Sequence, residues 1–269
     1  MPRPTATCRA IAGLALLLAA GLPMRAARAE ERMPGLDTQV ELVRLAPGTS
    51  AILTLPPNRP GRPLAVVLLL PDADAPGPRS AVYGQRLLEN GIALLEPDFA
   101  GAAPEDAPLP PAATQLALST AAIAADTRLD PRRLVVLGLG EGARAALLGG
   151  AAGLPLALLY PGCDAALATA AAGAAGPVLL LHGDADAANP PADCDRLAAA
   201  FPRPDAVRHR VLAGASYGWD AYDLVRPGGI AQLADPAGGP RRAWSRPDLT
   251  TTVIAADRVL GFVLAAVGR

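Results

Sequence analysis

A short glycine-rich turn in the middle of the chain matches the spacing of two different functional motifs. The stretch LVVLGLGEGARAALLGG, residues 134–150, places this turn between an apolar strand and the start of a helix. As the nucleophile-elbow pattern G-x-S-x-G, the turn puts Gly140 where an attacking Ser or Cys would stand. As G-x-G-x-x-G/A, the turn from Gly138 to Ala143 would instead cradle the phosphates of a dinucleotide.

The surroundings of the turn favour the elbow. A dinucleotide fingerprint normally follows the first strand of its domain, whereas at least two buried strands are predicted before Gly138. The next predicted strand ends LLYPGC and has no acid at its tip to bind a ribose. Dinucleotide binding through Gly138 to Ala143 is therefore the less favoured alternative.

The segments that must position this turn alternate between strands and helices. Continuous apolar runs such as PLAVVLLLP are typical of strands buried on both faces. The alternation predicts one α/β domain over residues 30–269, with a mostly parallel sheet flanked by helices on both faces. Strands are predicted at 40–47, 50–57, 63–71, 92–98, 133–139, 154–161, 177–184 and 207–214. Helices are predicted at 80–91 with Ser80 as cap, 113–128, 141–150, 191–201 and 250–267, and aperiodic loops at 98–112 and 226–248.

Two segments downstream of the turn resemble the dienelactone hydrolase family. PVLLLHGDADAANPPADC ends a strand in H-G-x-x-D, with Asp186 at the position of the family's catalytic acid. AGASYGWDAYD is similar to the family's G-A-x-H-G-F-D segment, with Tyr217 where the catalytic His would stand. Upstream, Pro71 and Asp72 occupy the turn that usually reads H-G and helps to form the oxyanion hole. The resemblance covers nearly all of residues 40–269 and implies an α/β-hydrolase fold.

This resemblance implies a site without its attacking group and without its base. Gly140 has no side-chain atom that could attack a carbonyl. A tyrosine such as Tyr217, with an ordinary pKa of about 10, is protonated at neutral pH and is a poor base. We therefore expect a chain that has lost hydrolase chemistry and binds a small ligand or a protein partner. An active ester or lactone hydrolase that uses other groups is the alternative, and Pro71, Asp72, Glu141 and Trp219 are candidate pocket residues.

Other polar residues have structural explanations. His182 is at a position where the resembling family has a structural His, and His209 alternates with apolar residues as expected in a strand. Ser119 and Ser216 are the nearest hydroxyls in sequence, but neither is on an elbow. The loop carboxylates Asp72, Asp74, Glu141, Asp184 and Asp186 could approach one crevice, yet without a His or Cys cluster we expect no metal and no cofactor. Asp186 itself is favoured as a turn residue.

The composition excludes several functional classes. All 24 basic residues are Arg, so the chain has no Lys for a Schiff base or a Walker motif. Arg3 and Arg9, the apolar run AIAGLALLLAAGL and the ARA at 27–29 predict a signal peptide over residues 1–29, with an apolar run too short to span a membrane. Without residues 1–29 the chain has 20 Arg against 25 Asp and Glu, a formal net charge of −5. This negative charge argues against nucleic-acid binding.

The predicted export has a consequence for the cysteines. We expect a periplasmic or secreted protein, which folds in an oxidising compartment and keeps no membrane span after the signal is removed. Cys163 and Cys194 then remain as an even pair, and a disulfide between them is predicted. Exported proteins that this chain resembles also pair cysteines at these two positions.

Overall fold

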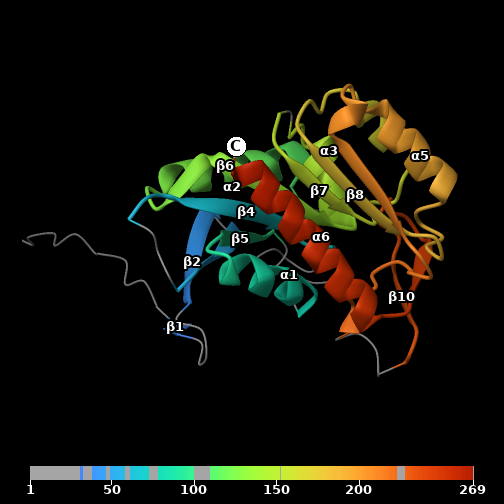
Figure 1. Ribbon diagram of the computed structural model, residues 1–269, viewed down its shortest axis with the longest axis horizontal. Helices are drawn as coiled ribbons and strands as arrows, with labels where there is room; N and C mark the ends of the chain where they lie inside the picture. Colours follow the sequence, from blue (N-terminus) through green and yellow to red (C-terminus); the bar gives the residue numbers. More distant parts are fainter. Residues whose placement is uncertain are drawn as a thin grey trace, which may run out of the picture.

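The computed structural model describes residues 31–32, 38–46, 49–57, 61–72, 78–99, 110–151, 153–222 and 228–268. The predicted signal peptide at residues 1–29 and the carboxylate Asp74 lie outside these ranges. Within them, strands and helices alternate as the sequence predicts, and a central sheet separates two sets of helices (Figure 1).

The central sheet has nine strands in the order β1-β2-β3-β5-β4-β6-β7-β8-β9. The two-residue strand β1 (Glu31–Arg32) extends an eight-stranded sheet. Strands β2 (Gln39–Ala46) and β3 (Thr49–Leu55) are antiparallel to their neighbours. Every neighbouring pair in the stretch β5-β4-β6-β7-β8-β9 is parallel. The parallel strands are β4 (Leu64–Leu70), β5 (Ala93–Asp98), β6 (Leu129–Leu139), β7 (Leu156–Leu159), β8 (Val178–Gly183) and β9 (Val207–Leu212). Every residue of β4 is buried, because helices cover both faces of the sheet.

Helices pack on both faces of this sheet and enclose two apolar cores. Helices α1 (Pro78–Glu89) and α6 (Leu249–Val267) pack together over one face. Helices α2 (Ala112–Ala125), α3 (Glu141–Leu148), α4 (Ala165–Ala171) and α5 (Pro191–Ala200) form a row over the other (Figure 1). Helix α6 is long and apolar enough to cross a membrane by length and composition alone. Its Val259 and Val263 are buried in the core that it shares with α1 and the sheet, which is how a core helix packs.

The structure corrects the predicted elements at three places. Helix α4 is a short element that the sequence analysis missed, and its start is capped by Asp164, whose carboxylate accepts a hydrogen bond from the Leu167 amide. Part of the predicted loop 226–248 forms a hairpin of β10 (Ala231–Ala234) and β11 (Arg242–Ser245), whose four-residue strands are too short for a clear periodicity. Helix α1 begins at Pro78, so Ser80 lies inside it and is not its cap. Proline is well suited to a first helical turn because its φ is preset and its missing N–H is not needed there.

Candidate functional site

The glycine turn forms a sharp junction between β6 and α3. Gly140 has φ 50° and ψ −115°, a backbone conformation that a residue with a side chain rarely adopts. Two positions on, Gly142 packs so closely on β4 that a Cβ there would lie 2.5 Å from the carbonyl carbon of Leu70. The turn therefore has the conformation expected of an elbow, held by a glycine at its tip and a glycine in the first turn of the helix.

The space beside Gly140 is filled by two other side chains. A Cβ built on Gly140 would meet the hydroxyl oxygen of Tyr217 and the carboxylate of Asp72, and its distance to Asp72 Cγ would be 2.5 Å. Real Cβ atoms do not make such contacts. Tyr217 and Asp72 therefore occupy the volume that a Ser or Cys side chain at position 140 would need.

The Asp72 carboxylate is held by at least three donors. Its Oδ1 accepts a hydrogen bond from the Glu141 amide at 3.0 Å, at the start of α3. Its Oδ2 accepts from the Tyr217 hydroxyl at 2.7 Å and from Arg79 Nη1 at 3.0 Å. Asp72 itself is only 4% exposed. An anion from outside would have to displace this buried carboxylate to reach the amide of Glu141.

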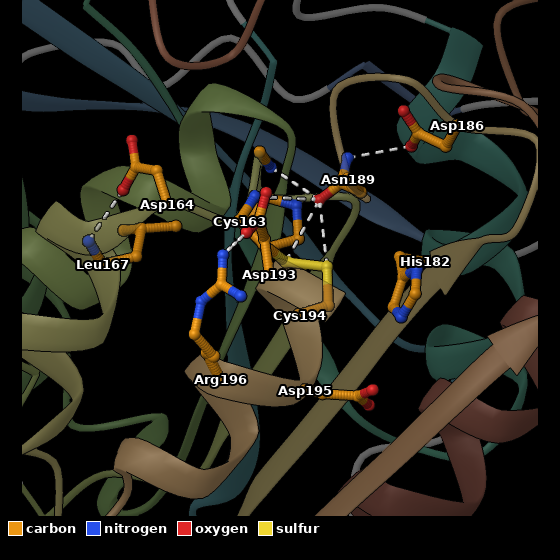
Figure 2. Close-up of a disulfide and its surroundings, with 12 residues drawn as sticks. Cys163, Asp164, Leu167, His182, Asp186, Asn189, Asp193, Cys194, Asp195 and Arg196 are labelled. Carbon is orange, nitrogen blue, oxygen red and sulfur yellow. Dashed lines mark hydrogen bonds and ion pairs between the residues drawn. A yellow bond between two sulfur atoms is a disulfide. The ribbon is translucent and has the colours of Figure 1, made fainter. Parts of the chain in front are cut away.

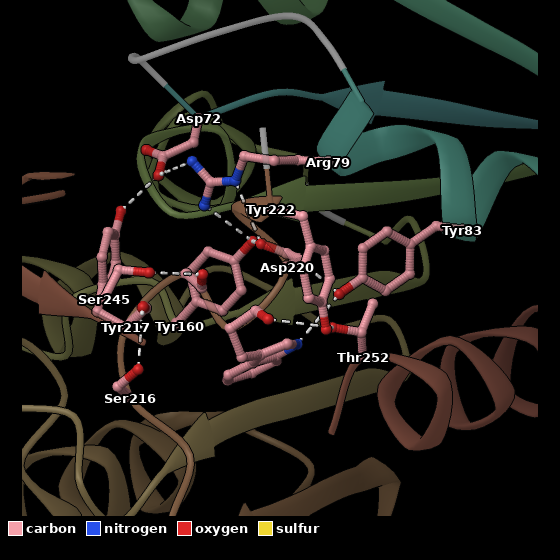
Figure 3. Close-up of polar contacts among 12 residues, drawn as sticks. Asp72, Arg79, Tyr83, Tyr160, Ser216, Tyr217, Asp220, Tyr222, Ser245 and Thr252 are labelled. Atoms are coloured by element: carbon pink, nitrogen blue, oxygen red, sulfur yellow. Dashed lines mark hydrogen bonds and ion pairs between the residues drawn. The ribbon is translucent and has the colours of Figure 1, made fainter. Parts of the chain in front are cut away.

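Arg79 connects this carboxylate to a second one. Its Nε donates to Asp220 Oδ1 at 3.2 Å and its Nη2 donates to the Tyr160 hydroxyl at 3.2 Å. The hydroxyls of Tyr160 and Tyr83 in turn donate to Asp220, at 2.8 and 2.7 Å to Oδ2. Figure 3 shows these groups converging on the Arg79 guanidinium and the Asp220 carboxylate.

Aromatic rings enclose the same cluster. Trp219 Nε1 donates to the Tyr83 hydroxyl at 3.2 Å, and the Trp219 ring packs edge-on against Tyr160 with 4.6 Å between centroids. Tyr160 also packs edge-on against Tyr217. We call the set Asp72, Arg79, Tyr83, Tyr160, Tyr217, Trp219 and Asp220 the buried polar network. Each member has at least one hydrogen-bond partner inside the set, so the side chains bind one another as a connected network.

Two features of the network bear on its chemistry. Burial raises the pKa of the Tyr217 hydroxyl well above its ordinary value, and the adjacent Asp72 carboxylate raises it further. Tyr217 therefore stays protonated and donates to Asp72, which is the opposite of what a base does. Tyr160 has φ 39°, the one positive φ at a non-glycine position among the described residues, and its hydroxyl contacts with Arg79 and Asp220 help to hold that conformation.

Asp186 has a different set of partners from the network. Its carboxylate accepts hydrogen bonds from the Ala188 amide at 2.9 Å and from Asn189 Nδ2 at 2.8 Å. Asn189 Oδ1 in turn accepts from the Gly162 amide at 2.7 Å, in the turn before α4 (Figure 2). Among the residues that the structure describes, Tyr217 is not a hydrogen-bond partner of Asp186. Burial raises the pKa of Asp186 to about 7.

The turn that Asn189 supports also carries one half of the disulfide. Cys163 and Cys194 are bonded, so the predicted pair is confirmed. Cys163 precedes α4 and Cys194 lies in α5, so the bond links the turn before α4 to helix α5 (Figure 2). Both cysteines are buried.

The two histidines form a pair on β8 and β9. His182 Nε2 and His209 Nε2 are 2.8 Å apart, and His182 Nδ1 lies 3.1 Å from the Gly183 carbonyl oxygen. Because a carbonyl oxygen can only accept, His182 donates through Nδ1 and accepts from His209 through Nε2. Burial lowers the pKa of both rings. The pair joins two strands, as expected of structural histidines.

A pocket of about 390 Å³ opens beside the elbow. Of the four candidate pocket residues, Pro71, Asp72 and Glu141 line it. Trp219, the fourth candidate, does not line it, because its ring is fully buried inside the network and its N–H is used by Tyr83. The other described lining residues come from β4, β5, α2, α3 and their ends, and are Leu70, Pro97, Asp98, Phe99, Pro110, Ala112, Gln115, Gly142, Ala145 and Leu148.

The two serines considered in the sequence are engaged elsewhere. Ser216 Oγ accepts a hydrogen bond from the Arg246 amide at 2.7 Å, and Ser119 Oγ donates to the Gln115 carbonyl inside α2. No group of three or more potential metal ligands occurs among the described residues. The amide of Glu141, which a dinucleotide phosphate would need at this helix start, is bonded to Asp72.

Solved structures resemble this one, although no family model and no curated protein sequence matches the chain. A candidate dienelactone hydrolase from Klebsiella pneumoniae superposes with a TM-score of 0.65 at 16% identity, over 84% of this chain and 98% of that one. A dienelactone hydrolase-like promiscuous phosphotriesterase from metagenomic libraries superposes with a TM-score of 0.61 at 17% identity, over 85% of this chain and 98% of that one. A dienelactone hydrolase from Anabaena variabilis superposes with a TM-score of 0.60 at 14% identity, over 89% of this chain and 98% of that one.

The chain has a dienelactone hydrolase-like α/β-hydrolase fold. The fold implied by the sequence resemblance is therefore confirmed. At such low identity the likeness extends to the fold alone, and the roles of Gly140, Asp186 and Tyr217 as former triad positions stay a prediction.

Several residues of this α/β-hydrolase-fold site were missed by the sequence analysis. Arg79 and Tyr83 lie on α1, Tyr160 directly follows β7, and Asp220 follows Trp219. Each is ordinary in its local pattern, and the residues are up to 141 positions apart in sequence. The one available signal was that Asp220 belongs to the segment that resembles the dienelactone hydrolases.

Proposed function

We propose that this protein is a non-catalytic member of the hydrolase fold that binds a small ligand in the pocket beside Gly140. The observation that carries this proposal is the occupied space at Gly140. Acyl transfer needs an attacking side chain and a free donor for the developing oxyanion. Position 140 has only hydrogen, Tyr217 and Asp72 fill the volume beside it, and the Glu141 amide is bonded to Asp72.

The hydrogen bonds of Tyr217 and Asp186 support the same proposal. Tyr217 donates its proton to Asp72, and the carboxylate of Asp186 accepts from Ala188 and Asn189 instead of orienting a base beside the elbow. Loss of triad residues costs about a million-fold in kcat in a serine protease. The pocket beside the turn at Gly140 has largely apolar walls and a few polar groups, which is typical of sites that bind small ligands.

Ester turnover tests the proposal. We expect the purified protein to hydrolyse nitrophenyl acetate and nitrophenyl butyrate no faster than the Tyr217→Phe variant, which keeps the ring but lacks the hydroxyl. Rates for both should equal the background given by an unrelated protein of the same concentration. A saturable wild-type rate well above that of Tyr217→Phe would overturn the proposal and favour an active hydrolase.

The predicted export is a separate part of the proposal. The disulfide between Cys163 and Cys194 supports an oxidising compartment, because such bonds are rare where thiols are kept reduced. We therefore propose a periplasmic or secreted location. Cell fractionation with an antibody, together with the N-terminal sequence of the mature protein, tests it, and an uncleaved chain in the cytoplasm would contradict it.

A further inference from the structure

The outer face of the β10–β11 hairpin carries an exposed row of basic and aromatic side chains. Trp244 on β11 is 59% exposed, although a tryptophan is on average highly buried. Its neighbours Ala243 and Ser245 are buried, so alternate residues face outwards. Arg242, Trp244 and Arg246 therefore form one row on the outer face, with about 7 Å between successive members, because a strand rises about 3.4 Å per residue.

The inner face of the hairpin is fixed to the protein. Leu233 and Ala243 are buried in the core that α1 and α6 share with the sheet. Ser245 Oγ donates to the Gly218 carbonyl oxygen at 2.9 Å. Figure 1 shows β10 at the opposite end of the molecule from β1 and β2. The outer row is therefore held in place before a partner arrives, which lowers the entropic cost of binding.

The hydrogen-bond register leaves backbone groups of β11 pointing outwards. In an antiparallel pair, opposite residues alternate between those that exchange backbone hydrogen bonds and those that do not. The Asp235 amide donates to the Arg241 carbonyl oxygen at 3.3 Å, so this pair is of the bonded kind. In the same register, Arg242 and Trp244 are both of the other kind. Their N–H and C=O groups therefore point away from β10.

The next outward position shows how this edge can be covered. The Arg246 amide donates to Ser216 Oγ at 2.7 Å, and the Arg246 carbonyl oxygen accepts from the same hydroxyl at 3.2 Å. Among the residues that the structure describes, none bonds to the backbone groups of Arg242 or Trp244. The outer edge of β11 is therefore covered at Arg246 and open at Arg242 and Trp244.

The open edge is also positively charged. The segment from Arg241 to Arg246 contains three Arg and no acid, in a chain with a formal net charge of −1. Arg241 pairs with Asp235, whereas Arg242 and Arg246 form no ion pair within the described part of the chain. The next acid in sequence, Asp248, caps α6. A partner with carboxylates would complement this row.

We propose that the open edge of β11 binds an extended acidic peptide that has a carboxylate two positions to each side of an apolar residue. The peptide adds a strand beside β11, and its main chain exchanges hydrogen bonds with the backbone groups of Arg242 and Trp244. Its apolar side chain packs on the Trp244 ring, and its carboxylates pair with Arg242 and Arg246. Open backbone groups favour a peptide over a sugar chain or a lipid surface, which would use the side chains alone.

This inference stands apart from the proposed small-ligand function. None of the described residues that line the pocket beside Gly140 belongs to the hairpin. Ester turnover by the wild-type protein would contradict the non-catalytic function and leave the peptide site unaffected.

Three matched peptides test the proposed chemistry. The first, fluorescein-labelled Val-Glu-Thr-Ile-Thr-Glu-Val, reads the same in both directions, so parallel and antiparallel pairing present the same side chains. The second has Gln in place of both Glu, and the third has an N-methylated Ile that cannot donate to a carbonyl. In anisotropy titrations of the wild-type protein, we expect the first peptide to bind several-fold more tightly than the other two. No binding of the first peptide, or equal affinity for all three, would overturn the inference.

Variants locate the binding on β11. Trp244→Ala and Arg242→Gln should each weaken the acidic peptide several-fold, and both change exposed side chains, so circular dichroism should be unaltered. The control is Arg208→Gln, which removes an exposed arginine from the edge strand β9 and should leave the affinity unchanged. An equal loss for Arg208→Gln and Arg242→Gln would mean that the peptide responds only to net charge, and would contradict the proposed site.

Two other occupants are outcomes of the same assay. Polygalacturonate and phosphatidylglycerol vesicles are tested with the wild-type protein and with Trp244→Ala at physiological salt. We expect neither to show binding that depends on Trp244. If either does while the acidic peptide does not bind, this face recognises a sugar chain or a membrane, and the peptide proposal is wrong.

Discussion

At the scale of single residues, the site is explained by what surrounds one glycine. Gly140 has a positive φ and a Cβ position that is blocked by Tyr217 and Asp72. Glycine relieves the backbone strain, which costs a residue with a side chain about 1–3 kcal/mol. It also leaves the room that the Tyr217 hydroxyl uses to reach Asp72. Gly140 and Tyr217 therefore fit each other sterically.

Replacing this glycine should be costly for two separable reasons. Gly150 also has a positive φ, 76°, but a Cβ there would meet nothing within 4 Å. Gly150→Ala should therefore lose about 1–3 kcal/mol of unfolding free energy from backbone strain alone. Gly140→Ala should lose about 1–3 kcal/mol more, because its Cβ overpacks a filled site. Urea unfolding of both variants measures this, and equal losses would show that the site is not closed.

The ionisation of Asp186 should appear in the pH dependence of stability. Its pKa in the folded protein is about 7, above the ordinary value of 3.8, because the carboxyl is buried. The folded protein holds this proton more tightly than the unfolded chain does. The protonated carboxyl therefore contributes stability that is fully present below pH 3.8 and is lost as the pH rises through 7. Asp186→Asn removes this loss, so its stability relative to wild type should improve between about pH 4 and about pH 8.

Thermal unfolding across that pH range measures the effect. The exposed Asp205→Asn variant serves as the control and should show a constant difference from wild type. A constant difference for Asp186→Asn as well would mean that Asp186 titrates as an ordinary carboxyl.

At the scale of elements, long periodic segments were predictable and short ones were not. The buried runs of β4, β6 and β8 and the helix α6 have lengths and patterns that identify them in sequence. Helix α4 has seven residues and the hairpin strands four each, which is too short for a periodic pattern to stand out. The elbow and two of the residues over it, Asp72 and Tyr217, were also singled out from motifs. The contact of Asp72 with Arg79 was not predictable from motifs, since it depends on how α1 packs.

The disulfide between the α4 turn and α5 should stabilise the fold measurably. It closes a sequence separation of 31 residues, for which the chain-entropy model gives about 3–4 kcal/mol. The double variant Cys163→Ala with Cys194→Ala should lose about that much unfolding free energy in urea. Both sulfurs are buried, so a reductant should have little effect on the native wild type and a large effect in urea. Equal stability of wild type and double variant would contradict this.

At the scale of the whole molecule, the buried polar network joins both halves of the chain. Arg79 on α1 contacts Asp72 after β4 and Asp220 near the start of α6, with both carboxylates buried. Removing one partner of a buried ion pair leaves an uncompensated charge, which costs about 3–5 kcal/mol. The network therefore ties the helix α1 to segments that are far apart in sequence.

Two arginines on α1 allow this to be tested within one helix. Arg79→Met should cost about 3–5 kcal/mol of unfolding free energy, because Asp72 and Asp220 lose a buried partner. Arg86→Met should cost about 1 kcal/mol or less, because its contact with Asp257 is exposed to solvent. Chemical denaturation of the two variants makes the comparison. Similar small losses would mean that the network does not stabilise the fold.

We propose that no described group at the elbow can attack a substrate. The most direct measurement is intact-protein mass spectrometry after incubation with a fluorophosphonate, which labels activated hydroxyl nucleophiles, with wild type and Tyr217→Phe in parallel. We expect an unmodified mass for both proteins. A stoichiometric adduct on the wild type that maps to the buried polar network or to Ser216, and that is lost on unfolding before labelling, would contradict it.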